Sequence, residues 1–473
     1  MNTKFVHFIK GFLHALSANV IRLIISIVLT LFLPKILGVE EYSYWQLYLF
    51  YVTYTAYSSL GFCEGTYLKY GGKQYDKLKG EVMASQFWTL AIYEAGFSIL
   101  CGLLFQLFVD DPVKRFILCL ALISSIFDIL RYLLQCVLQA TDRIQDFAKV
   151  MTSERVLFFV FAVFVLLVGV RDYRVLIFSE IMARVLSMIY AMWVCKETVF
   201  CKFKFNKEAF DESRELISIG FKLLLATLAS QLVIGIVRFM IEQRWGTIVF
   251  GKVSLTLSLS NMVITCIGAV SIVLFPVLKN MQKERLESLY ETMRIVLTVP
   301  VLFVLLFYVP MKAILSAWLV QYADSLRYLA VLLPICVYET RFCALINTYF
   351  KAYRRENQIL LVNVVTVILS LVLSVVTVYG MDSLDLTVCS IVVLMIFKSV
   401  FAEWILKRDV SMHVLTDNLL EIGLTIIFII GSLSLSDWKA FLLYAVAYVA
   451  YLGLHRKKIV NQFKEAKQII INR

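Results

Sequence analysis

Long apolar stretches recur along the whole chain, from Gly11 to Leu454, with only short segments between them. A helix needs roughly 20 mostly apolar residues to cross about 30 Å of hydrocarbon. We place about fourteen spans, at residues 11–37, 44–62, 83–108, 115–138, 151–170, 174–195, 217–244, 252–278, 291–311, 326–349, 357–379, 385–406, 418–436 and 438–454. These runs are too long and too uniformly apolar for barrel strands, and lipid-facing backbone must satisfy its own hydrogen bonds. The sequence therefore predicts an all-α polytopic membrane protein.

Composition and the distribution of positive charge agree with this prediction. Of the 473 residues, 60% are hydrophobic and 17% are charged, whereas a soluble chain carries about 25% charged residues. With a cytoplasmic N-terminus, 27 of the 46 lysines and arginines lie in cytoplasmic segments and seven in external loops. This bias predicts that both termini are cytoplasmic. It also accounts for most of the net charge of +12, so we expect anionic lipids rather than nucleic acid as partners.

The cysteines and histidines show no metal-binding pattern. The ten cysteines contain no CxxC pair, and the four histidines are scattered. Structural zinc sites and disulfide frameworks need regular spacings. We therefore expect no metal site and no cofactor, and we interpret most cysteines as packing residues.

Two halves of the chain resemble each other. A Gly-x3-aromatic motif follows the first span, as Gly38 with Tyr42, and the seventh, as Gly246 with Phe250, at an offset of 208 residues. The basic segment 196–216 lies between the sixth and seventh spans and has the character of a linker. Parallel repeats of this kind occur among transporters. We predict a six-helix bundle at residues 1–205, a second one at 206–410, and two extra spans with a basic tail at 411–473.

Polar residues inside four spans recur at i+3 or i+4, which aligns them along one face of each helix. These are the first two spans of each half. The stripes are Asn19, Arg22, Ser26 and Thr30; Tyr44, Tyr48, Tyr51, Thr55 and Ser58; Thr227, Gln231, Arg238 and Glu242; and Ser254, Ser258, Asn261 and Thr265. Two interpretations stay open, a water-filled cavity and polar packing between helices. The stripes that carry arginine favour the cavity, and the tyrosines suit a path for sugars.

Arg22 is the most informative single residue. It lies about 17 Å into the first span, at 1.5 Å per residue, and has no acidic residue within one helical turn. A lone arginine at this depth costs at least about 2.5–3.5 kcal/mol. An anionic ligand would offset this cost, because the planar guanidinium binds phosphate oxygens in pairs. The alternative is an interhelical ion pair with Glu94 or another acid.

Other charges within the spans carry less information. Three combinations have the spacing of self-neutralising pairs. They are Asp128/Arg131, Glu180/Arg184 and Arg238/Glu242. Three cations near predicted cytoplasmic ends are expected to extend to the membrane surface, namely Lys222, Arg155 and Arg294. Arg341 and Lys398 lie deeper, and both a ligand role and a pairing role stay open. The surplus of cations in the spans indicates an anionic cargo.

Several segments are similar to Wzx-type polysaccharide flippases. The similarity is carried by Gly11-Phe12 through Arg22, by Leu33-Pro34-Lys35-Ile36-Leu37-Gly38-Val39-Glu40-Glu41-Tyr42, by Gly61-Phe62-Cys63-Glu64-Gly65 with Lys69-Tyr70-Gly71-Gly72, and by Asn347 to Ala352 with Arg354 and Arg355. It covers essentially the whole chain. The resemblance implies the fold of the multidrug/oligosaccharidyl-lipid/polysaccharide exporter superfamily, in which two six-helix bundles form a V. The final pair of spans resembles the lipid II flippase branch.

The resemblance also implies a function. Such flippases move a polyprenyl-pyrophosphate-linked oligosaccharide from the inner to the outer leaflet of the bacterial cytoplasmic (inner) membrane, by alternating access and without catalysis. The implied partners are this lipid-linked substrate, membrane lipids and polysaccharide-assembly proteins. Arg22 matches the cationic position of the first helix, and Arg238 matches by region. The candidate substrate-binding residues are Arg22, Asn19, Ser26, Tyr48, Tyr51, Gln231, Arg238, Asn261 and Arg341, and the candidate ion-coupling residue is Glu242.

Two other functions are kept as alternatives. A cation-coupled drug antiporter of the same superfamily usually has a carboxylate in its first helix, where this chain has none; Glu242 keeps this alternative open. A membrane glycosyltransferase or polysaccharide polymerase generally needs a large loop that bears catalytic groups. The external loops here are short and contain no paired carboxylates.

Overall fold

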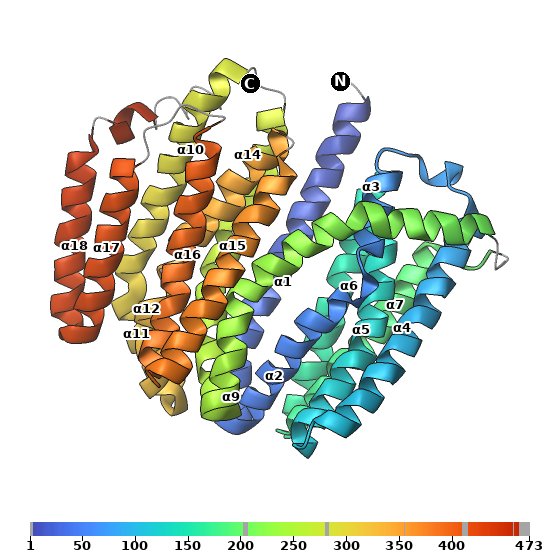
Figure 1. Cartoon of the computed structure of the whole chain (residues 1–473), viewed down its shortest axis with the longest axis horizontal. Helices are drawn as coiled ribbons and strands as arrows, with labels where there is room; N and C mark the ends of the chain where they lie inside the picture. The colour runs from blue at the N-terminus through green and yellow to red at the C-terminus, as the bar shows by residue number, and fades with distance from the viewer. Residues whose placement is uncertain are drawn as a thin grey trace. The chain divides into compact units, whose positions relative to one another are not determined.

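A computed structural model describes the backbone of residues 3–201, 207–279, 283–353, 355–408, 415–456 and 458–462. Side chains are described for residues 19–201, 210–265, 289–353, 355, 357–408, 415–456 and 458–462. The described residues form helices joined by short connections and contain no strand, which confirms the prediction of an all-α membrane protein (Figure 1). The linker residues 202–206 and the basic tail beyond residue 462 lie outside the described part.

The chain divides into two compact units, Met1–Leu228 and Ala229–Arg473, and we describe each by itself. The boundary between the units falls inside one long helix, α9 (Lys207–Lys279). The bundle boundaries expected from the sequence, after residues 205 and 410, remain predictions.

Unit 1 contains ten described helical elements before α9. They are α1 (Thr3–Leu37), α2 (Val39–Thr55), η1 (Ala56–Ser59), α3 (Phe62–Tyr70), η2 (Tyr75–Lys77), α4 (Gly80–Phe108), α5 (Pro112–Ala140), α6 (Ile144–Leu167), α7 (Tyr173–Val194) and the short α8 (Lys196–Val199), of which η1 and η2 are 3-10 turns. α5 contacts α2, α3, α4 and α7, and α1 packs on α6. The middle of α5 is therefore surrounded by helices, and its polar side chains must find partners there.

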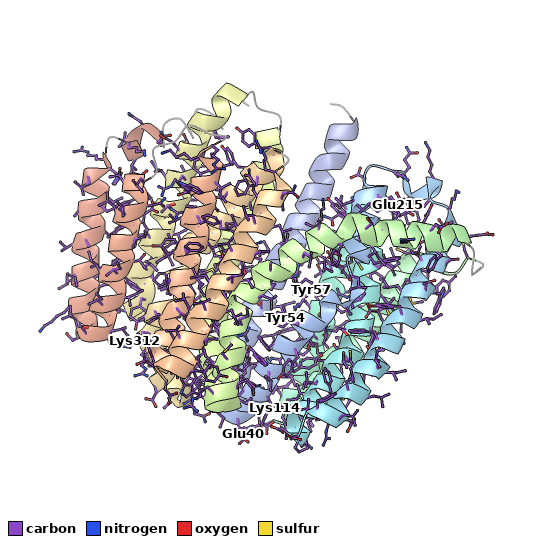
Figure 2. All side chains as sticks on the ribbon, in the orientation of Figure 1. Glu40, Tyr54, Tyr57, Lys114, Glu215 and Lys312 are labelled. Carbon is purple, nitrogen blue, oxygen red and sulfur yellow. The ribbon has the colours of Figure 1, made fainter. Side chains whose placement is uncertain are left out.

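Unit 2 contains the remaining helices. They are α10 (Lys283–Val304), η3 (Leu305–Phe307), α11 (Tyr308–Trp318), η4 (Val320–Leu326), α12 (Arg327–Leu332), α13 (Ile335–Thr340), η5 (Arg341–Ile346), α14 (Asn347–Ala352), α15 (Glu356–Val375), η6 (Val376–Gly380), α16 (Leu384–Leu406), α17 (Leu415–Ser434) and α18 (Asp437–Leu454). α17 and α18 pack on each other, and α16 contacts α12, α13, α15 and η5. The half-buried Lys312 of α11, labelled in Figure 2, pairs with Asp437 of α18 at 2.7 Å.

Every span expected from the sequence coincides with a helix. Ten helices among the described residues are long and apolar enough to cross a membrane, or eleven if Val320–Leu332 and Ile335–Ala352, bent by 46°, count as one span. One of the ten, Phe210–Thr265, lies within α9, and α9 as a whole contains both predicted spans 217–244 and 252–278. The predicted spans 44–62 and 438–454 correspond to the shorter α2 and α18.

The two glycines of the repeated motif share one unusual backbone conformation. Gly38 has φ 86° and ψ 175°, and Gly246 has φ 82° and ψ 174°. This region is accessible essentially to glycine alone. Each glycine turns the chain from the first into the second predicted span of its half. The internal repeat inferred from the sequence thus has a common structural element in both units.

The predicted span 44–62 is shorter in the structure than expected. α2 ends at Thr55, the 3-10 turn η1 follows, and Leu60 (φ 52°) and Gly61 (φ 88°) then reverse the backbone twist before α3. Two consecutive left-handed residues cannot continue an α-helix. Ser58, Ser59 and Gly61 are residue types that favour such a break, and the predicted span ran through them.

α3 and the first part of α9 approach each other very closely within unit 1. A Cβ added to Gly220 would lie 1.9 Å from the Gly61 carbonyl oxygen, and one added to Gly65 would lie 2.0 Å from that of Leu216. Lys69 of α3 donates to Glu215 of α9 at 2.9 Å, at the position labelled in Figure 2. Only glycine permits this backbone contact, so α3 is fixed to the helix that continues into unit 2.

Candidate functional site

Unit 1 buries a cluster of ionised side chains on three neighbouring helices. This unit 1 charge cluster consists of Asp128 and Arg131 of α5, Glu154 of α6, and Glu180 and Arg184 of α7. Arg131 pairs with Asp128 and approaches Glu154 to 3.1 Å. Arg184 donates to Glu180 at 2.8 Å. The pairs Asp128/Arg131 and Glu180/Arg184 predicted from spacing are therefore confirmed.

The pairing in this cluster is incomplete. Arg184 lies 3.6 Å from Asp128 and 3.8 Å from Glu154, too far for good hydrogen bonds. Within the described part of the chain, Arg131 Nε, Arg184 Nε and Nη1, and Glu180 Oε2 are buried without hydrogen-bond partners. Such groups are normally satisfied. The cluster therefore keeps hydrogen-bonding capacity that its own members do not use.

Two more arginines lie beside the unit 1 charge cluster. Arg22 of α1 interacts electrostatically with Arg155, Glu154 and Arg131. Arg155 of α6 also interacts with Glu154 and Asp128. Both arginines are half-buried, and no residue with a described side chain forms a hydrogen bond or a close ion pair with either of them.

The charges of this region do not cancel. The cluster alone contains two arginines and three acids, a formal charge of −1. Arg22 and Arg155 change the sum to +1. The uncompensated charge belongs to the two arginines that lack close partners, so this part of unit 1 favours an anion.

Unit 2 buries a cluster with the same number of charges. This unit 2 charge cluster consists of Arg294 of α10, Arg341 of η5, Glu403 of α16, and Asp417 and Glu421 of α17. Arg294 lies 3.0 Å from Glu403 and 2.9 Å from Glu421. Arg341 approaches Glu421 to 2.5 Å. Both arginines and both glutamates are at most 2% exposed.

Neighbouring polar groups form further hydrogen bonds with the members of the unit 2 charge cluster. Asn418 accepts from both arginines at 2.9 Å and donates to Glu403 at 2.7 Å. Ser399 accepts from Arg341, and the Tyr290 hydroxyl donates to Glu403. At the edge of the cluster, Lys458 donates to Asp417 at 2.8 Å, and His455 lies 3.1 Å from the same carboxyl group. Lys458 brings the formal charge to zero, and the cluster has the properties of a structural core.

The unit 2 charge cluster decides two expectations from the sequence, those for Arg294 and Arg341. The expectation that Arg294 extends to the membrane surface is wrong, because its side chain is fully buried among acids. For Arg341, a ligand role and a pairing role were both open, and its contacts are those of a paired residue. Lys398 is likewise paired: it lies 3.2 Å from Glu339, 3.1 Å from Ser230, and 4.2 Å from the centre of the Phe342 ring.

The predicted site residues of unit 1 fall into two groups. Tyr48 is fully buried and donates to Ser124 of α5 at 2.8 Å, beside the charges of Glu180 and Arg184. Tyr51 is half-buried next to Phe50. On α1, Asn19 and Arg22 are half-buried and Ser26 is exposed. The α1 stripe is accessible, whereas the Tyr48 hydroxyl takes part in internal packing.

The predicted site residues of unit 2 lie on α9. Gln231 and Asn261 are exposed. Arg238 is half-buried, donates to Ser254 at 2.9 Å and lies 4.9 Å from the centre of the Phe250 ring. Glu242 is 1% exposed and accepts hydrogen bonds from Gln243 and Thr247. Roles in substrate binding or ion coupling for these residues remain predictions.

Glu94, the alternative partner considered for Arg22, is occupied elsewhere. Its Oε2 lies 2.7 Å from the Ser58 hydroxyl, and it forms no ion pair with any residue whose side chain is described. The sequence interpretation also missed Arg155 as a neighbour of Arg22. A signal existed, because the adjacent Glu154 is an acid inside an apolar span and needs a cation.

Comparison with known families identifies the chain. Residues 82–323, just over half of the sequence, match the model of a family described as "Polysaccharide biosynthesis protein". The chain belongs to this family. No curated protein matches the sequence. The resemblance to polysaccharide flippases, first seen in the motifs around Gly38 and Gly61, is thus confirmed at family level.

Comparison with solved structures shows the fold of this chain. One is described as the lipid II flippase MurJ in an inward closed conformation, with a TM-score of 0.65 and 12% identity over 95% of this chain and 100% of that chain. Another is an inward-facing multidrug resistance MATE family transporter of the MOP superfamily, with a TM-score of 0.64 and 14% identity over 83% and 98%. A MOP superfamily transporter from Pyrococcus furiosus matches at 0.53 and 12% over 85% and 95%. The chain has the MOP fold.

Proposed function

We propose that this chain is a flippase that moves a polyprenyl-pyrophosphate-linked oligosaccharide from the inner to the outer leaflet by alternating access. The observation that carries the proposal is the uncompensated charge of Arg22 and Arg155 beside the unit 1 charge cluster. Membership of a polysaccharide biosynthesis family and a fold shared with a lipid flippase support it.

The chemistry of the cargo fits these arginines. A diphosphate presents several anionic oxygens, and a guanidinium binds two of them at once through its planar fork. Arg22 and Arg155 are near enough to each other to interact electrostatically, so one diphosphate would relieve the repulsion between them. The exposed Ser26 and half-buried Asn19 on the same helix supply hydrogen bonds for the first sugar.

The remaining elements of the proposal follow from the fold class. The lipid tail stays in the bilayer, the polar head crosses through the protein, and the two units change access in turn. The chain acts as a transporter and not as an enzyme. We place it in the bacterial inner membrane with both termini cytoplasmic, where polysaccharide-assembly proteins would deliver and receive the oligosaccharide.

Reconstitution in proteoliposomes tests this function. A fluorescent polyprenyl-pyrophosphate oligosaccharide is placed in the membrane, and its appearance in the outer leaflet is followed by enzymatic modification or lectin quenching. Arg22→Ala should lower transport about 10- to 100-fold, the expected loss of a charge-assisted pair of hydrogen bonds. Arg22→Lys should recover only part of it.

The matched control is Arg171→Ala, which changes an exposed arginine of the same unit that forms no ion pair with any residue whose side chain is described. Its transport should equal wild type. Wild-type transport by Arg22→Ala would remove Arg22 from the site. Transport of drug-like cations instead of the lipid-linked cargo, with a dependence on Glu242, would favour the antiporter alternative.

A further inference from the structure

Glu94 occupies an unusual place in unit 1. It is the fifteenth of the 29 residues of α4, so it lies about 21 Å from either end of that helix. Its side chain is fully buried, with 0% exposure. α4 contains no lysine or arginine, and its other acid, Glu81, lies in the first turn. A carboxyl group at this depth is a functional candidate by position alone.

No lysine, arginine or histidine with a described side chain forms an ion pair with the Glu94 carboxyl group. Oε2 lies 2.7 Å from the Ser58 hydroxyl of η1, and Oε1 is buried without a hydrogen-bond partner among the described residues. The titratable groups that interact with Glu94 are the Cys63 thiol of α3 and the adjacent Tyr93 hydroxyl, and neither is a cation. From α5 and α8, which also pack on α4, no described lysine, arginine or histidine pairs with it.

The hydrogen bonds around Ser58 indicate where the proton is. The Ser58 hydroxyl lies 2.7 Å from Glu94 Oε2 and 2.9 Å from the carbonyl oxygen of Thr55. A serine has a single hydroxyl hydrogen, and a carbonyl oxygen can only accept. One hydrogen shared between two acceptors gives two weak, bent contacts, whereas two full hydrogen bonds form when Ser58 donates to Thr55 and Glu94 donates to Ser58. That arrangement requires a protonated, uncharged Glu94.

Burial leads to the same conclusion independently. An ionised carboxylate that is removed from water without a cation or several donors is strongly disfavoured, and such a group takes up a proton instead. Glu242 is a useful contrast, because it is equally buried but accepts from two side-chain donors, Gln243 and Thr247. Those donors stabilise a carboxylate, whereas the single hydroxyl beside Glu94 does not.

We propose that Glu94 is a proton-binding site of unit 1, which holds a proton while η1 covers it and releases the proton when water reaches it. In the release step the Glu94 O–H bond breaks, the proton passes to water, and the side chain remains as a carboxylate. Uptake is the reverse step. The ligand of this site is H⁺, and the residue differs from Glu242, the ion-coupling candidate of the sequence.

The position of Ser58 connects this proton to the rest of unit 1. Ser58 belongs to η1, and the chain continues through Leu60 and Gly61 into α3. Gly61 lies in direct backbone contact with Gly220 of α9. A change at η1 on proton release therefore acts on the helix that leads into unit 2. On the basis of the proposed function, this contact couples proton movement to transport.

Infrared difference spectroscopy tests the proton site without any cargo. The full-length protein in lipid nanodiscs should show a protonated-carboxyl band that shifts in D₂O and is lost in Glu94→Gln. Ser58→Ala, which keeps the carboxyl group but removes its hydrogen-bond partner, should shift that band. Glu242→Gln should leave it unchanged. A spectrum of Glu94→Gln identical to wild type would show that Glu94 is ionised and would overturn the proposal.

Transport under an imposed pH gradient tests the coupling separately. Wild type should be accelerated by the gradient, whereas Glu94→Gln should transport at a rate that does not respond to it. If Glu94→Gln does not fold, Glu94→Asp should fold and show a shifted pH profile. A wild-type rate that ignores the gradient overturns the coupling. Absence of lipid-linked oligosaccharide transport in wild type overturns the proposed function, while the infrared result still decides on the proton site.

Discussion

The two buried charge clusters have the same composition and different surroundings. Each contains two arginines and three acids, so each has a formal charge of −1. In unit 2, Lys458 cancels this charge at 2.8 Å from Asp417. In unit 1, Arg22 and Arg155 overcompensate it and have no close partner among the described residues.

This difference separates a structural role from a binding role. The unit 2 charge cluster connects α10, η5, α16 and α17, and Asn418, Ser399 and Tyr290 form further hydrogen bonds with its members, while Arg341 Nη2 stays buried without a hydrogen-bond partner among the described residues. The unit 1 charge cluster leaves buried donors unused and lies beside half-buried cations. The same kinds of charged residue form a closed network when their charges cancel, and attract an anion when half-buried cations beside them are left over.

The largest effect is expected in unit 2. Arg341→Met leaves Glu421 and Glu403 with one arginine and no spare cation nearby. Breaking a buried pair from one side costs about 3–5 kcal/mol. Thermal unfolding of the purified full-length protein, followed by intrinsic fluorescence, should show a clear drop in Tm.

A matched control uses an ion pair of the same unit that is exposed. Arg327 and Asp385 are 2.8 Å apart with side chains 57% and 62% exposed. Arg327→Met should therefore change stability by less than about 1 kcal/mol. Equal effects of Arg341→Met and Arg327→Met would contradict the view that the unit 2 charge cluster is a structural core.

A smaller effect is expected for the corresponding change in unit 1. Arg131→Met lowers the formal charge of that region from +1 to zero, and Glu154 keeps Arg184 and Arg155 as neighbours. The loss should be about 1–3 kcal/mol, the range for a hydrogen bond to a charged group. The same unfolding assay compares it with Arg341→Met. A loss in unit 1 as large as that in unit 2 would show that Arg155 does not compensate.

Arg22→Ala should have almost no effect on stability. Arg22 has two cations, Arg155 and Arg131, and one acid, Glu154, as electrostatic neighbours, so its removal relieves repulsion as well as attraction. We expect a change of less than about 1 kcal/mol, together with the loss of transport described above. A strongly destabilised Arg22→Ala protein with normal transport per folded molecule would assign Arg22 to structure.

The fold could be predicted from the sequence to a large extent. Apolar length located the long helices, because the membrane leaves a hydrophobic chain few alternatives, but not the short α3 and α8. The glycine motif at Gly38 and Gly246 identified the repeat, because its backbone conformation excludes other residues. The break after Thr55 was missed, although Ser58, Ser59 and Gly61 are residue types that favour turns.

The candidate site was predictable only in part. Pairs within one helix, such as Glu180/Arg184, follow from i+4 spacing. Pairs between helices, such as Arg294 with Glu403 and Glu421, join residues more than 100 positions apart and depend on which helices pack together. Single-helix geometry cannot supply that information. For the same reason Arg22 was recognised as unusual by its depth, while its neighbour Arg155 was not recognised.

The smallest effect concerns Glu64, a buried acid of unit 1 that forms no ion pair with an arginine among the described residues. Glu64 lies in α3, outside the predicted spans, and burial raises the pKa of its carboxyl group. Because its folded-state pKa is above the unfolded value, the folded state binds more protons, and this contribution to stability is lost as the pH rises through that range. Glu64→Gln should remove the loss. Between pH 5 and pH 8 the variant should therefore lose less stability than wild type, by less than about 1 kcal/mol. Unfolding measured at both pH values checks this, and an unchanged pH dependence would show that Glu64 is ionised at no cost.

The acids of the unit 1 charge cluster, which have arginine neighbours, should show no such trend, and this would separate acids compensated by arginine from an acid that is only buried.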